Sequence, residues 1–378
     1  MINSLMMNEK KITVSYILPI KDVYSCQNYG AVSLVVSEFI NYSNHDQHFV
    51  FGKKHKLKVL RYGKFVPRKI LTIPFVKKSL LFSVSCLFYI KTKLYKNNII
   101  EIHNRPKMFR YFNFINNYVI VFFHNHPRYM EGSKTVNERM YLLKHASKLF
   151  FNSDYIKKQF LEDLNVSNQL INKCATVYPS FDFNKYNSFY NVKKSKNIIF
   201  VGRLVPDKGC LEFLTAFDKI KKECSDWKLI IVGPMTNKNN DYVKKVNVIM
   251  SSLESYVTYL KYQTHEEVLK LFASSEIACL PSQWEEPFGR VVMEGMAMGC
   301  ATITSKRGGI PEIAGDDAIV IEPTVDNLKE ALLKLTKNSV LRQSLQIKGR
   351  QRIQEKFNLE KTSKRIDDLR EQVIIKQS

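Results

Sequence analysis

The feature of this sequence that most constrains its fold is a regular alternation of short apolar runs with longer amphipathic stretches. In the first half, five apolar runs have the length of buried strands: 12–20, 97–104, 118–125, 148–153 and 175–180. Helical periodicity occurs between them, as at 31–43 and 137–147. Strands and helices alternating at this spacing favour an open parallel sheet covered by helices on both faces.

A second alternating series follows a polar, aperiodic stretch at 181–196. Its strand-like runs are 197–204, 228–233, 276–282, 301–306 and 317–323. Helical patterns occur at 209–224, 265–274, 289–299 and 325–337. We therefore predict an α/β protein with two Rossmann-like domains, 1–183 and 197–355, joined by a linker at 184–196. The final segment, 356–378, has the pattern of a charged amphipathic helix.

The charge of the chain is large and unevenly placed. The net charge is +23, and residues 51–110 contain 16 basic residues against one acidic residue, Glu101. Such a field suits an anionic membrane surface, a nucleic acid or an acidic substrate. A bias toward Lys and Asn codons is the simpler explanation, but it would not concentrate the charge in one half.

Cysteine spacing and hydropathy indicate the compartment. The seven cysteines show no CxxC spacing, which favours reduced thiols in the cytosol. The N-terminus lacks the pattern of a signal peptide, and no apolar run reaches the roughly 20 residues of a membrane span. The longest candidate, 80–90, is either a core helix or an apolar element that rests on a membrane.

Two loops in the second half combine residues that suit an anionic, hydroxylated ligand. In 201–209, Gly202 follows a strand, and Arg203 and Lys208 lie near a helix start, which favours a phosphate or diphosphate. In 285–294, the carboxylates of Glu286 and Glu294 can accept hydrogen bonds from vicinal hydroxyls. The backbone N–H groups of Gly289 and Arg290 are expected to be free at that helix start.

Other loops after strands are weaker candidates. Gly308 and Gly309 offer backbone amides for a further phosphate contact, and Gly30 opens the first long helix. In the first half, polar side chains gather at the ends of two strands: His103, Asn104, Arg105, His124 and His126. His124 and His126 have the spacing of a metal pair, but no third ligand has suitable spacing, so we favour a catalytic or substrate-orienting histidine.

These motifs together resemble glycosyltransferase family four. The segments that carry the resemblance are 201–209, 280–299 and 306–315, with the Glu-x7-Glu signature at Glu286 and Glu294. The resemblance implies a GT-B architecture, in which two Rossmann-like domains face each other across a cleft and a C-terminal helix crosses back. It also implies a retaining transfer from a nucleotide-diphosphate sugar, without a metal or other cofactor.

The resemblance also implies roles for individual residues. Arg203 and Lys208 would bind the diphosphate and stabilise the leaving group, and His124 would contact the donor sugar. Glu286, with the backbone of Phe288 and Gly289, would hold sugar hydroxyls, and Glu294 would bind the ribose. The remaining expected donor contacts are Gly30, Gly202, Tyr262 and Arg290. The expected acceptor contacts are His103, Asn104, Arg105 and His126.

The preferred interpretation is a cytoplasmic, peripheral hexosyltransferase that uses a UDP-sugar and builds a lipopolysaccharide core or another surface glycan. Its partners would be the nucleotide sugar, the glycan or glycolipid acceptor and an anionic membrane face. Four alternatives are open: a nucleotide-sugar epimerase, a phosphorylase, a glycosidase, and a basic nucleic-acid- or membrane-binding protein without catalysis. We expect no nucleic-acid partner, because no motif for one occurs.

Overall fold

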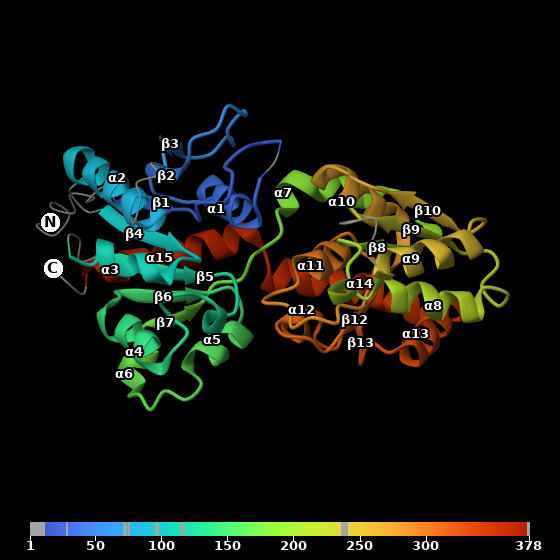
Figure 1. Cartoon of the computed structure of the whole chain (residues 1–378). Coiled ribbons are helices and arrows are strands. Elements are labelled where there is room, and N and C mark those ends of the chain that lie inside the picture. The colour runs from blue at the N-terminus through green and yellow to red at the C-terminus, as the bar shows by residue number, and fades with distance from the viewer. Residues whose placement is uncertain are drawn as a thin grey trace, which may run out of the picture. The chain divides into compact units, whose positions relative to one another are not determined.

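The computed structural model describes residues 12–27, 29–70, 74, 76–94, 98–114, 118–235 and 241–375. The chain forms two compact units (Figure 1). Unit 1 contains the chain up to Pro179 together with the C-terminal segment from Leu359, and unit 2 contains Ser180–Asn358. The chain therefore leaves unit 1 once, completes unit 2, and returns to unit 1 for its last helix.

The described part of unit 1 is built on a parallel sheet in the order β3-β2-β1-β4-β5-β6-β7. Its strands are β1 (Thr13–Ile17), β2 (Gln47–Lys53), β3 (Lys64–Arg68), β4 (Asn98–His103), β5 (Val119–Phe123), β6 (Lys148–Phe151) and β7 (Cys174–Thr176). Its longer helices are α1 (Ala31–Asn41), α2 (Lys78–Lys93), α4 (Val136–His145), α5 (Asp154–Leu161) and α15 (Leu359–Ile375). Short helical turns are η1 (Pro106–Met108), α3 (Phe109–Phe112), η2 (Pro127–Tyr129) and α6 (Asn168–Ile171).

Helix α15 packs on the sheet of unit 1 (Figure 1). Its apolar side chains, including Ile366 and Val373, share a core cluster with Ile99 of β4 and with Ile120 and Phe122 of β5. Buried apolar side chains contribute roughly 1.5–3 kcal/mol each to folding, so this face holds the end of the chain firmly to unit 1.

The described part of unit 2 has a second parallel sheet, in the order β10-β9-β8-β11-β12-β13. Its strands are β8 (Ser195–Val201), β9 (Lys228–Val232), β10 (Val257–Leu260), β11 (Ser275–Leu280), β12 (Ala301–Ser305) and β13 (Ile319–Ile321). Its helices are α7 (Phe183–Tyr186), η3 (Asn187–Asn191), η4 (Pro206–Lys208), α8 (Cys210–Ile220), α9 (Asp241–Ser252), α10 (His265–Ser274), α11 (Arg290–Ala297), α12 (Ile310–Ala314), α13 (Val325–Lys337) and α14 (Ser339–Lys356). Two parallel α/β units confirm the predicted fold class.

The segment expected to be a linker, 184–196, is folded into unit 2. It contains most of α7, all of η3 and the start of β8. Arg350 explains part of this order, because its guanidinium lies 3.7 Å from the ring centroid of Tyr190 and donates a 2.7 Å hydrogen bond to Oδ1 of Asn187. The segment is polar because these contacts are polar, so its composition resembles that of a linker.

Helix α2 contains the apolar run 80–90. Its buried face carries Phe82, Cys86 and Ile90, whereas Val84 and Phe88 are 54% and 72% exposed. The run is therefore a core helix on one side and an exposed apolar surface on the other. Across the described residues, we find no helix that combines the length and hydropathy of a membrane span.

Candidate functional site

The C-terminal ends of β8 and β11 frame a pocket in unit 2. These strands are neighbours where the strand order of the sheet reverses, which is where open parallel sheets bind ligands. The pocket lies within unit 2 and is bordered by all three loops that the sequence singles out. Its lining residues include Gly202, Lys208, Ser282, Glu286, Gly289 and Ile310. The tertiary structure thus brings together side chains that are up to about a hundred residues apart.

Lys208 and Glu286 face each other in this pocket and form an ion pair. The hydroxyl of Ser282 lies 2.8 Å from Oε1 of Glu286 and 3.0 Å from the carbonyl oxygen of Asp207. The Lys208 side chain is 26% exposed and the Glu286 side chain 16%. The predicted diphosphate cation and the predicted sugar-binding carboxylate therefore neutralise each other in this state. Ser282 was missed by sequence reasoning, although it directly follows a strand.

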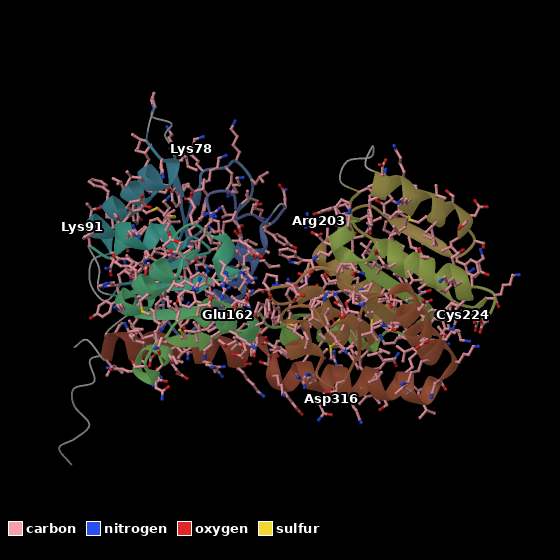
Figure 2. The ribbon with its side chains drawn as sticks, turned by 60° about the horizontal axis from the view of Figure 1, so that its bottom comes forward. Lys78, Lys91, Glu162, Arg203, Cys224 and Asp316 are labelled. Carbon is pink, nitrogen blue, oxygen red and sulfur yellow. The ribbon has the colours of Figure 1, made fainter. Side chains whose placement is uncertain are left out.

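Arg203 is the exposed cation of the site. Figure 2 labels it in unit 2, at the loop that follows β8. Within the residues that the structure describes, no carboxylate pairs with its guanidinium. The backbone before it is fixed, since the N–H of Gly202 donates a 2.9 Å hydrogen bond to the carbonyl of Val232. A full positive charge is thus available to an anionic ligand.

The loop at 306–315 supports the 285–294 segment. The N–H of Gly308 donates a 2.6 Å hydrogen bond to Oε2 of Glu285, and the N–H of Gly309 donates a 2.8 Å bond to the carbonyl of Glu286. Gly308 has φ 58°, and a Cβ there would lie 2.1 Å from that carbonyl oxygen. The expectation that these two amides contact a phosphate is therefore wrong for this state, because close packing of the two loops uses them internally.

Helix α11 begins at the pocket without a side-chain cap. Its N-cap residue, Gly289, has φ 108°, and a Cβ there would lie 2.9 Å from Cγ1 of Ile310. Phe288 is 4% exposed, and its ring centroid lies 5.9 Å from that of Phe357. The buried ring anchors the loop, and the glycine lets the helix start close to the neighbouring loop.

Glu294 lies on α11, one turn beyond the pocket-lining residue Arg290, and is only 4% exposed. Its Oε1 accepts a 2.8 Å hydrogen bond from Nε of Arg290 and lies 2.9 Å from Nε2 of His265. Burial acts to raise the pKa of Glu294, but the charge and hydrogen bonds of His265 and Arg290 outweigh it and lower that pKa to about 2. Glu294 is therefore ionised. Sequence reasoning missed His265, whose only local signal is its place directly after the helix-capping residue Thr264.

Tyr262 lies between β10 and α10 and is 70% exposed. Its ring is available to stack on a flat ligand, and its predicted contact with a nucleobase stays a prediction.

In unit 1, the N-terminus of α1 is already occupied by a carboxylate. Asp22 accepts hydrogen bonds from the hydroxyl of Ser33 and from backbone groups of Gly30, Val32 and Ser33. A Cβ at Gly30 would lie 2.0 Å from Oδ1 of Asp22. The small residue at position 30 thus accommodates Asp22, and the position expected for a donor phosphate holds an internal acid in this state.

The polar residues at the C-terminal ends of β4 and β5 divide into two groups. His103 and His124 contact each other, with Nδ1 of His103 2.9 Å from Nε2 of His124. Asn104 is a structural residue, because its Oδ1 accepts hydrogen bonds from the backbone N–H groups of His124 and Asn125. It has φ 53°, so the side-chain bonds hold a conformation that asparagine tolerates better than most residues.

His126 belongs to a separate arrangement. Its Nε2 lies 3.0 Å from Oε1 of Gln159, and its Nδ1 accepts a hydrogen bond from the backbone N–H of Arg128. Arg105 is half-buried and donates a long hydrogen bond, 3.4 Å, to the carbonyl of Asn104. The acceptor contacts predicted for His103, Asn104, Arg105 and His126 stay predictions. Among the described residues, no three His, Cys, Asp or Glu side chains gather as a metal site would require.

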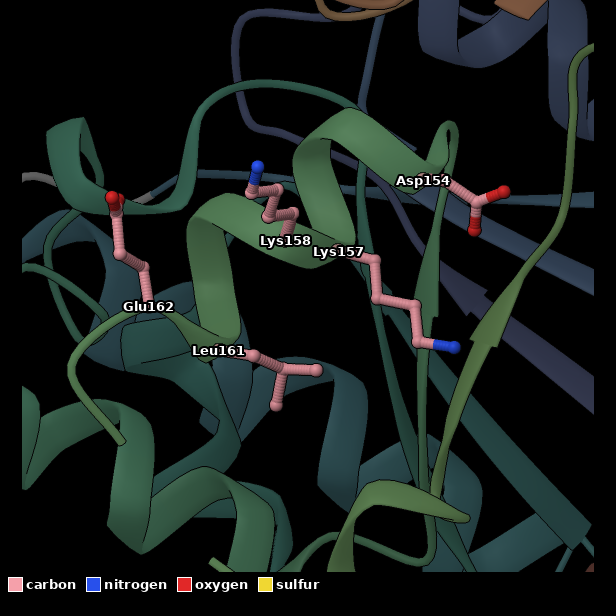
Figure 3. Close-up of a pocket in the computed structure, with 5 residues that line it drawn as sticks. All are labelled: Asp154, Lys157, Lys158, Leu161 and Glu162. Atoms are coloured by element: carbon pink, nitrogen blue, oxygen red, sulfur yellow. The ribbon is translucent and has the colours of Figure 1, made fainter. Parts of the chain in front are cut away.

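A second hollow lies on α5 in unit 1 (Figure 3). It is lined by Asp154, Lys157, Lys158, Leu161 and Glu162. Figure 3 shows that these side chains point in different directions rather than toward one centre. No predicted site residue lines this hollow, so we place the candidate site at β8 and β11.

Comparison with known proteins defines the class of unit 2. Residues 183–352, nearly all of unit 2, match the family model described as glycosyl transferases group 1. The match includes all three motifs that border the pocket, whereas Gly30 and the histidines predicted as site residues lie in unit 1. Unit 2 is therefore similar to the domain that this family model describes.

Individual relatives share part of their length with this chain. Spore coat protein SA of Bacillus subtilis (strain 168) is 31% identical over 159 residues, which cover 37% of this chain and 42% of the relative. The lipopolysaccharide 1,2-N-acetylglucosaminetransferase of Salmonella typhimurium is 26% identical over 234 residues, 60% of this chain and 59% of the relative. The chain thus spans about half the length of the relatives it matches.

A solved structure extends the likeness in fold to nearly the whole chain. The Anabaena protein HepE, in complex with UDP and glucose, has a TM-score of 0.72 and 16% sequence identity, and the match covers 94% of this chain and 98% of HepE. At this identity the match shows the fold alone, which is the two-domain fold known as GT-B.

Proposed function

We propose that this protein is a glycosyltransferase that moves a sugar from a nucleotide-diphosphate sugar to a glycan acceptor. The observation that carries the proposal is the pocket at β8 and β11, which Lys208 and Glu286 line and which is bordered by the loop that carries Arg203. Two cations suit a diphosphate and a carboxylate suits sugar hydroxyls, so one pocket offers both kinds of group that a nucleotide sugar requires.

The ion pair between Lys208 and Glu286 indicates how the donor would enter. A diphosphate would draw the Lys208 ammonium away from Glu286, and the freed carboxylate would accept hydrogen bonds from sugar hydroxyls. During transfer, negative charge develops on the departing diphosphate, and Arg203 and Lys208 would stabilise it. These two cations supply the charge for a transfer that needs no metal ion. Retention of configuration and the ribose contact of Glu294 are further parts of the proposal.

The likeness to a lipopolysaccharide N-acetylglucosaminetransferase supports a more specific proposal. We favour a UDP-hexose donor and an acceptor in a lipopolysaccharide core or another surface glycan. The sugar and the linkage depend on single hydroxyl contacts, which the donor panel below addresses.

The surface of α2 supports a peripheral position on the cytoplasmic face of an anionic membrane. Val84 and Phe88 are exposed on this helix, and Lys78 and Lys91 lie near its two ends (Figure 2). An apolar strip beside lysines is the arrangement by which interfacial helices bind anionic lipid.

The test is a panel of UDP-glucose, UDP-N-acetylglucosamine, UDP-galactose and GDP-mannose, scored by thermal shift and by donor hydrolysis. A bound donor at 100 times its Kd stabilises a protein by about 2.7 kcal/mol, so one of the four should raise the Tm. Arg203→Met should abolish the shift, and Lys245→Met, which removes an exposed lysine from α9, should retain it. If no donor stabilises the wild-type protein, the proposal fails.

Product analysis separates the proposal from its enzymatic alternatives. Transfer to a glycan releases the nucleoside diphosphate, an epimerase changes the sugar without a glycan acceptor, and a phosphorylase needs phosphate and no nucleotide. Release of nucleoside diphosphate that rises with added glycan acceptor is the expected result.

A further inference from the structure

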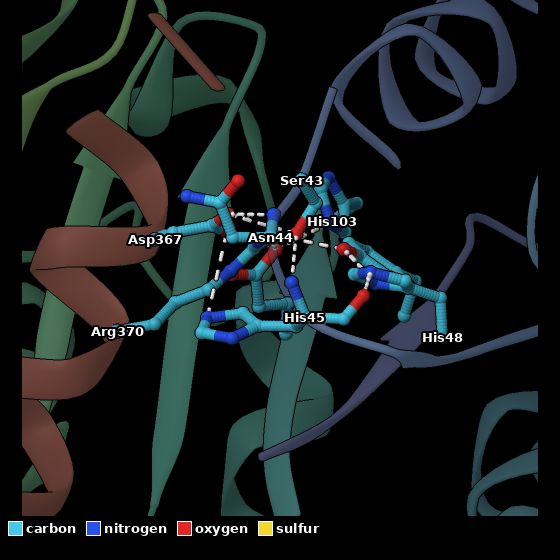
Figure 4. Close-up of polar contacts among 9 residues, drawn as sticks. Ser43, Asn44, His45, His48, His103, Asp367 and Arg370 are labelled. Atoms are coloured by element: carbon cyan, nitrogen blue, oxygen red, sulfur yellow. Dashed lines mark hydrogen bonds and ion pairs between the residues drawn. The ribbon is translucent and has the colours of Figure 1, made fainter. Parts of the chain in front are cut away.

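A buried polar network joins helix α15 to the strands of unit 1 (Figure 4). Arg370 of α15 donates hydrogen bonds of 2.8 and 3.1 Å to the two carboxylate oxygens of Glu101 on β4. It also donates a 2.8 Å bond to Asp367 and a 3.0 Å bond to the hydroxyl of Tyr16. All four residues are at most 1% exposed, so this network lies in the interior of unit 1.

The Glu101 end of the network carries a negative charge. Burial acts to raise the pKa of Glu101, but the charge of Arg370 and hydrogen bonds outweigh it and lower that pKa to about 2. An ionised carboxylate can only accept hydrogen bonds. A neighbouring histidine is therefore more stable when it directs a protonated ring nitrogen, rather than a lone pair, toward Glu101.

The neighbouring ring is that of His103, which ends β4. Its Nε2 lies 3.5 Å from Oε2 of Glu101, and this nitrogen is buried without a hydrogen-bond partner among the described residues. A lone pair there would face an anion, so a His103 ring with a single proton carries it on Nε2. Its Nδ1 is then an acceptor, 2.9 Å from Nε2 of His124. His124 must supply the proton of that bond, which leaves Nδ1 of His124 unprotonated.

His124 is held firmly in this state. Its ring stacks on Phe122 with centroids 4.2 Å apart, and its backbone is bonded to the side chains of Asn104 and Asn152. Burial holds the pKa of His124 well below its ordinary value, so the ring is neutral. Nδ1 of the His124 ring has no hydrogen-bond partner within the described residues, and the residue is 8% exposed.

We propose that Glu101, held by Arg370 of the C-terminal helix, sets the tautomer of His124 through His103. In this arrangement His124 presents Nδ1 as a hydrogen-bond acceptor to a hydroxyl of the substrate sugar. The contact between His124 and a sugar rests on the proposed function, whereas the tautomer of His124 does not. Glu101, His103 and Arg370 act through His124 and are positioning residues.

The wild-type protein tests the tautomer directly. Long-range ¹H–¹⁵N spectra of the full chain with labelled histidine separate protonated from unprotonated ring nitrogens, and His124→Gln identifies the His124 signals by their loss. The expected result is an unprotonated Nδ1 and a protonated Nε2 for His124 at neutral pH. A protonated Nδ1 would overturn the proposal whether or not the protein transfers sugar.

Glu101→Gln tests the cause. The amide keeps the shape of the carboxylate but can direct an N–H toward His103, which favours the lone pair on Nε2 of His103 and reverses both tautomers. The ¹⁵N signal of Nδ1 in His124 should then move toward the protonated value. His48→Gln is the matched control, because His48 reaches the same Arg370 through Tyr16 on a branch that does not contact His124. A packing role alone for Glu101 would leave the His124 tautomer unchanged in Glu101→Gln.

Activity forms a separate arm. Outer partners of metal-bound histidines typically contribute about 10- to 100-fold, and a comparable effect is expected here. Glu101→Gln should therefore lower the rate of sugar transfer by about 10-fold or more, and His48→Gln should not. If the spectra show the expected tautomers but His124→Gln transfers sugar normally, the sugar contact of His124 fails and the tautomer assignment stands.

Discussion

Lys208 and Glu286, which lie in the loops after β8 and β11, form an ion pair in the candidate site of unit 2. Each is the residue that the resemblance assigns to a different part of the donor, the diphosphate and the sugar. A donor must therefore break this ion pair and form two new interactions, one with each residue. The pair also keeps two partly buried charges compensated before a ligand binds.

Lys208→Met should weaken donor binding. A hydrogen bond to a charged group contributes about 1.5–3 kcal/mol, which corresponds to roughly a 10- to 100-fold rise in Kd. Isothermal titration with the donor identified by the panel measures this change. Lys245→Met serves as the control for loss of one positive charge. An unchanged Kd in Lys208→Met would show that the diphosphate does not contact this side chain.

Glu294 should make unit 2 sensitive to acid. Its pKa is about 2 in the folded protein, against about 4.3 for an unfolded glutamate. Because the folded pKa is depressed, the stabilisation is present above about pH 4.3 and is lost as the pH falls toward about 2. At neutral pH it amounts to about 3 kcal/mol, at 1.36 kcal/mol for each pKa unit. Glu294→Gln should therefore show a smaller drop in stability between pH 7 and pH 3, measured by urea unfolding. Equal drops in both proteins would contradict the assignment.

Lys194 should stabilise the region where α10 and α11 end. Its ammonium donates to the carbonyl oxygens of Ala273, Ser275 and Met298 at 2.8, 3.1 and 3.0 Å. Lys194→Met leaves these carbonyls without that donor, and each unsatisfied buried polar group costs about 1–3 kcal/mol. Hydrogen exchange of the peptides around 272–300 should accelerate in Lys194→Met. The adjacent exposed Lys193→Met is the control, and equal exchange in both variants would refute the prediction.

Phe88 should contribute to membrane binding. Burying a phenylalanine side chain contributes about 1.5–3 kcal/mol, so Phe88→Ser should weaken binding to anionic liposomes roughly 10- to 100-fold in sedimentation. Added salt should weaken the wild-type protein as well, because the lysines of α2 act through screened charge. Val340→Ser, at an equally exposed apolar position on α14, should bind like the wild-type protein. A wild-type protein that does not sediment with anionic liposomes at low salt would exclude the membrane contact.

Most buried strands and several amphipathic helices were predictable, whereas the strands β2, β3 and β10 were missed. The runs at 118–125, 148–153 and 276–282 correspond to β5, β6 and β11, whose residues are almost all buried. In contrast, β3 and β10 lie at sheet edges and have mixed burial. These two strands lack the continuous apolar run that reveals a fully buried strand. Helix α14 was also not predicted, because it is largely polar around its circumference.

The motif residues of unit 2 could be found in the sequence because glycines, cations and carboxylates follow strands whose C-terminal ends lie on the same edge of the sheet. Their partners could not be found in this way. Ser282, His265 and Asp22 have no distinctive local spacing, and each acts only because another loop brings it within hydrogen-bond distance.

The opening alternation of strands and helices was sufficient for the two α/β domains, since hydrophobic periodicity depends on neighbours a few residues apart. In contrast, only the folded chain shows which charged side chains pair with one another. Lys208 pairs with Glu286 across 78 positions, and Arg370 with Glu101 across 269. Such contacts depend on three-dimensional distance and on the removal of water, and neither quantity is encoded in the local pattern. The tertiary structure therefore decided which charges are compensated, which amides are occupied and which ring nitrogens contact another side chain.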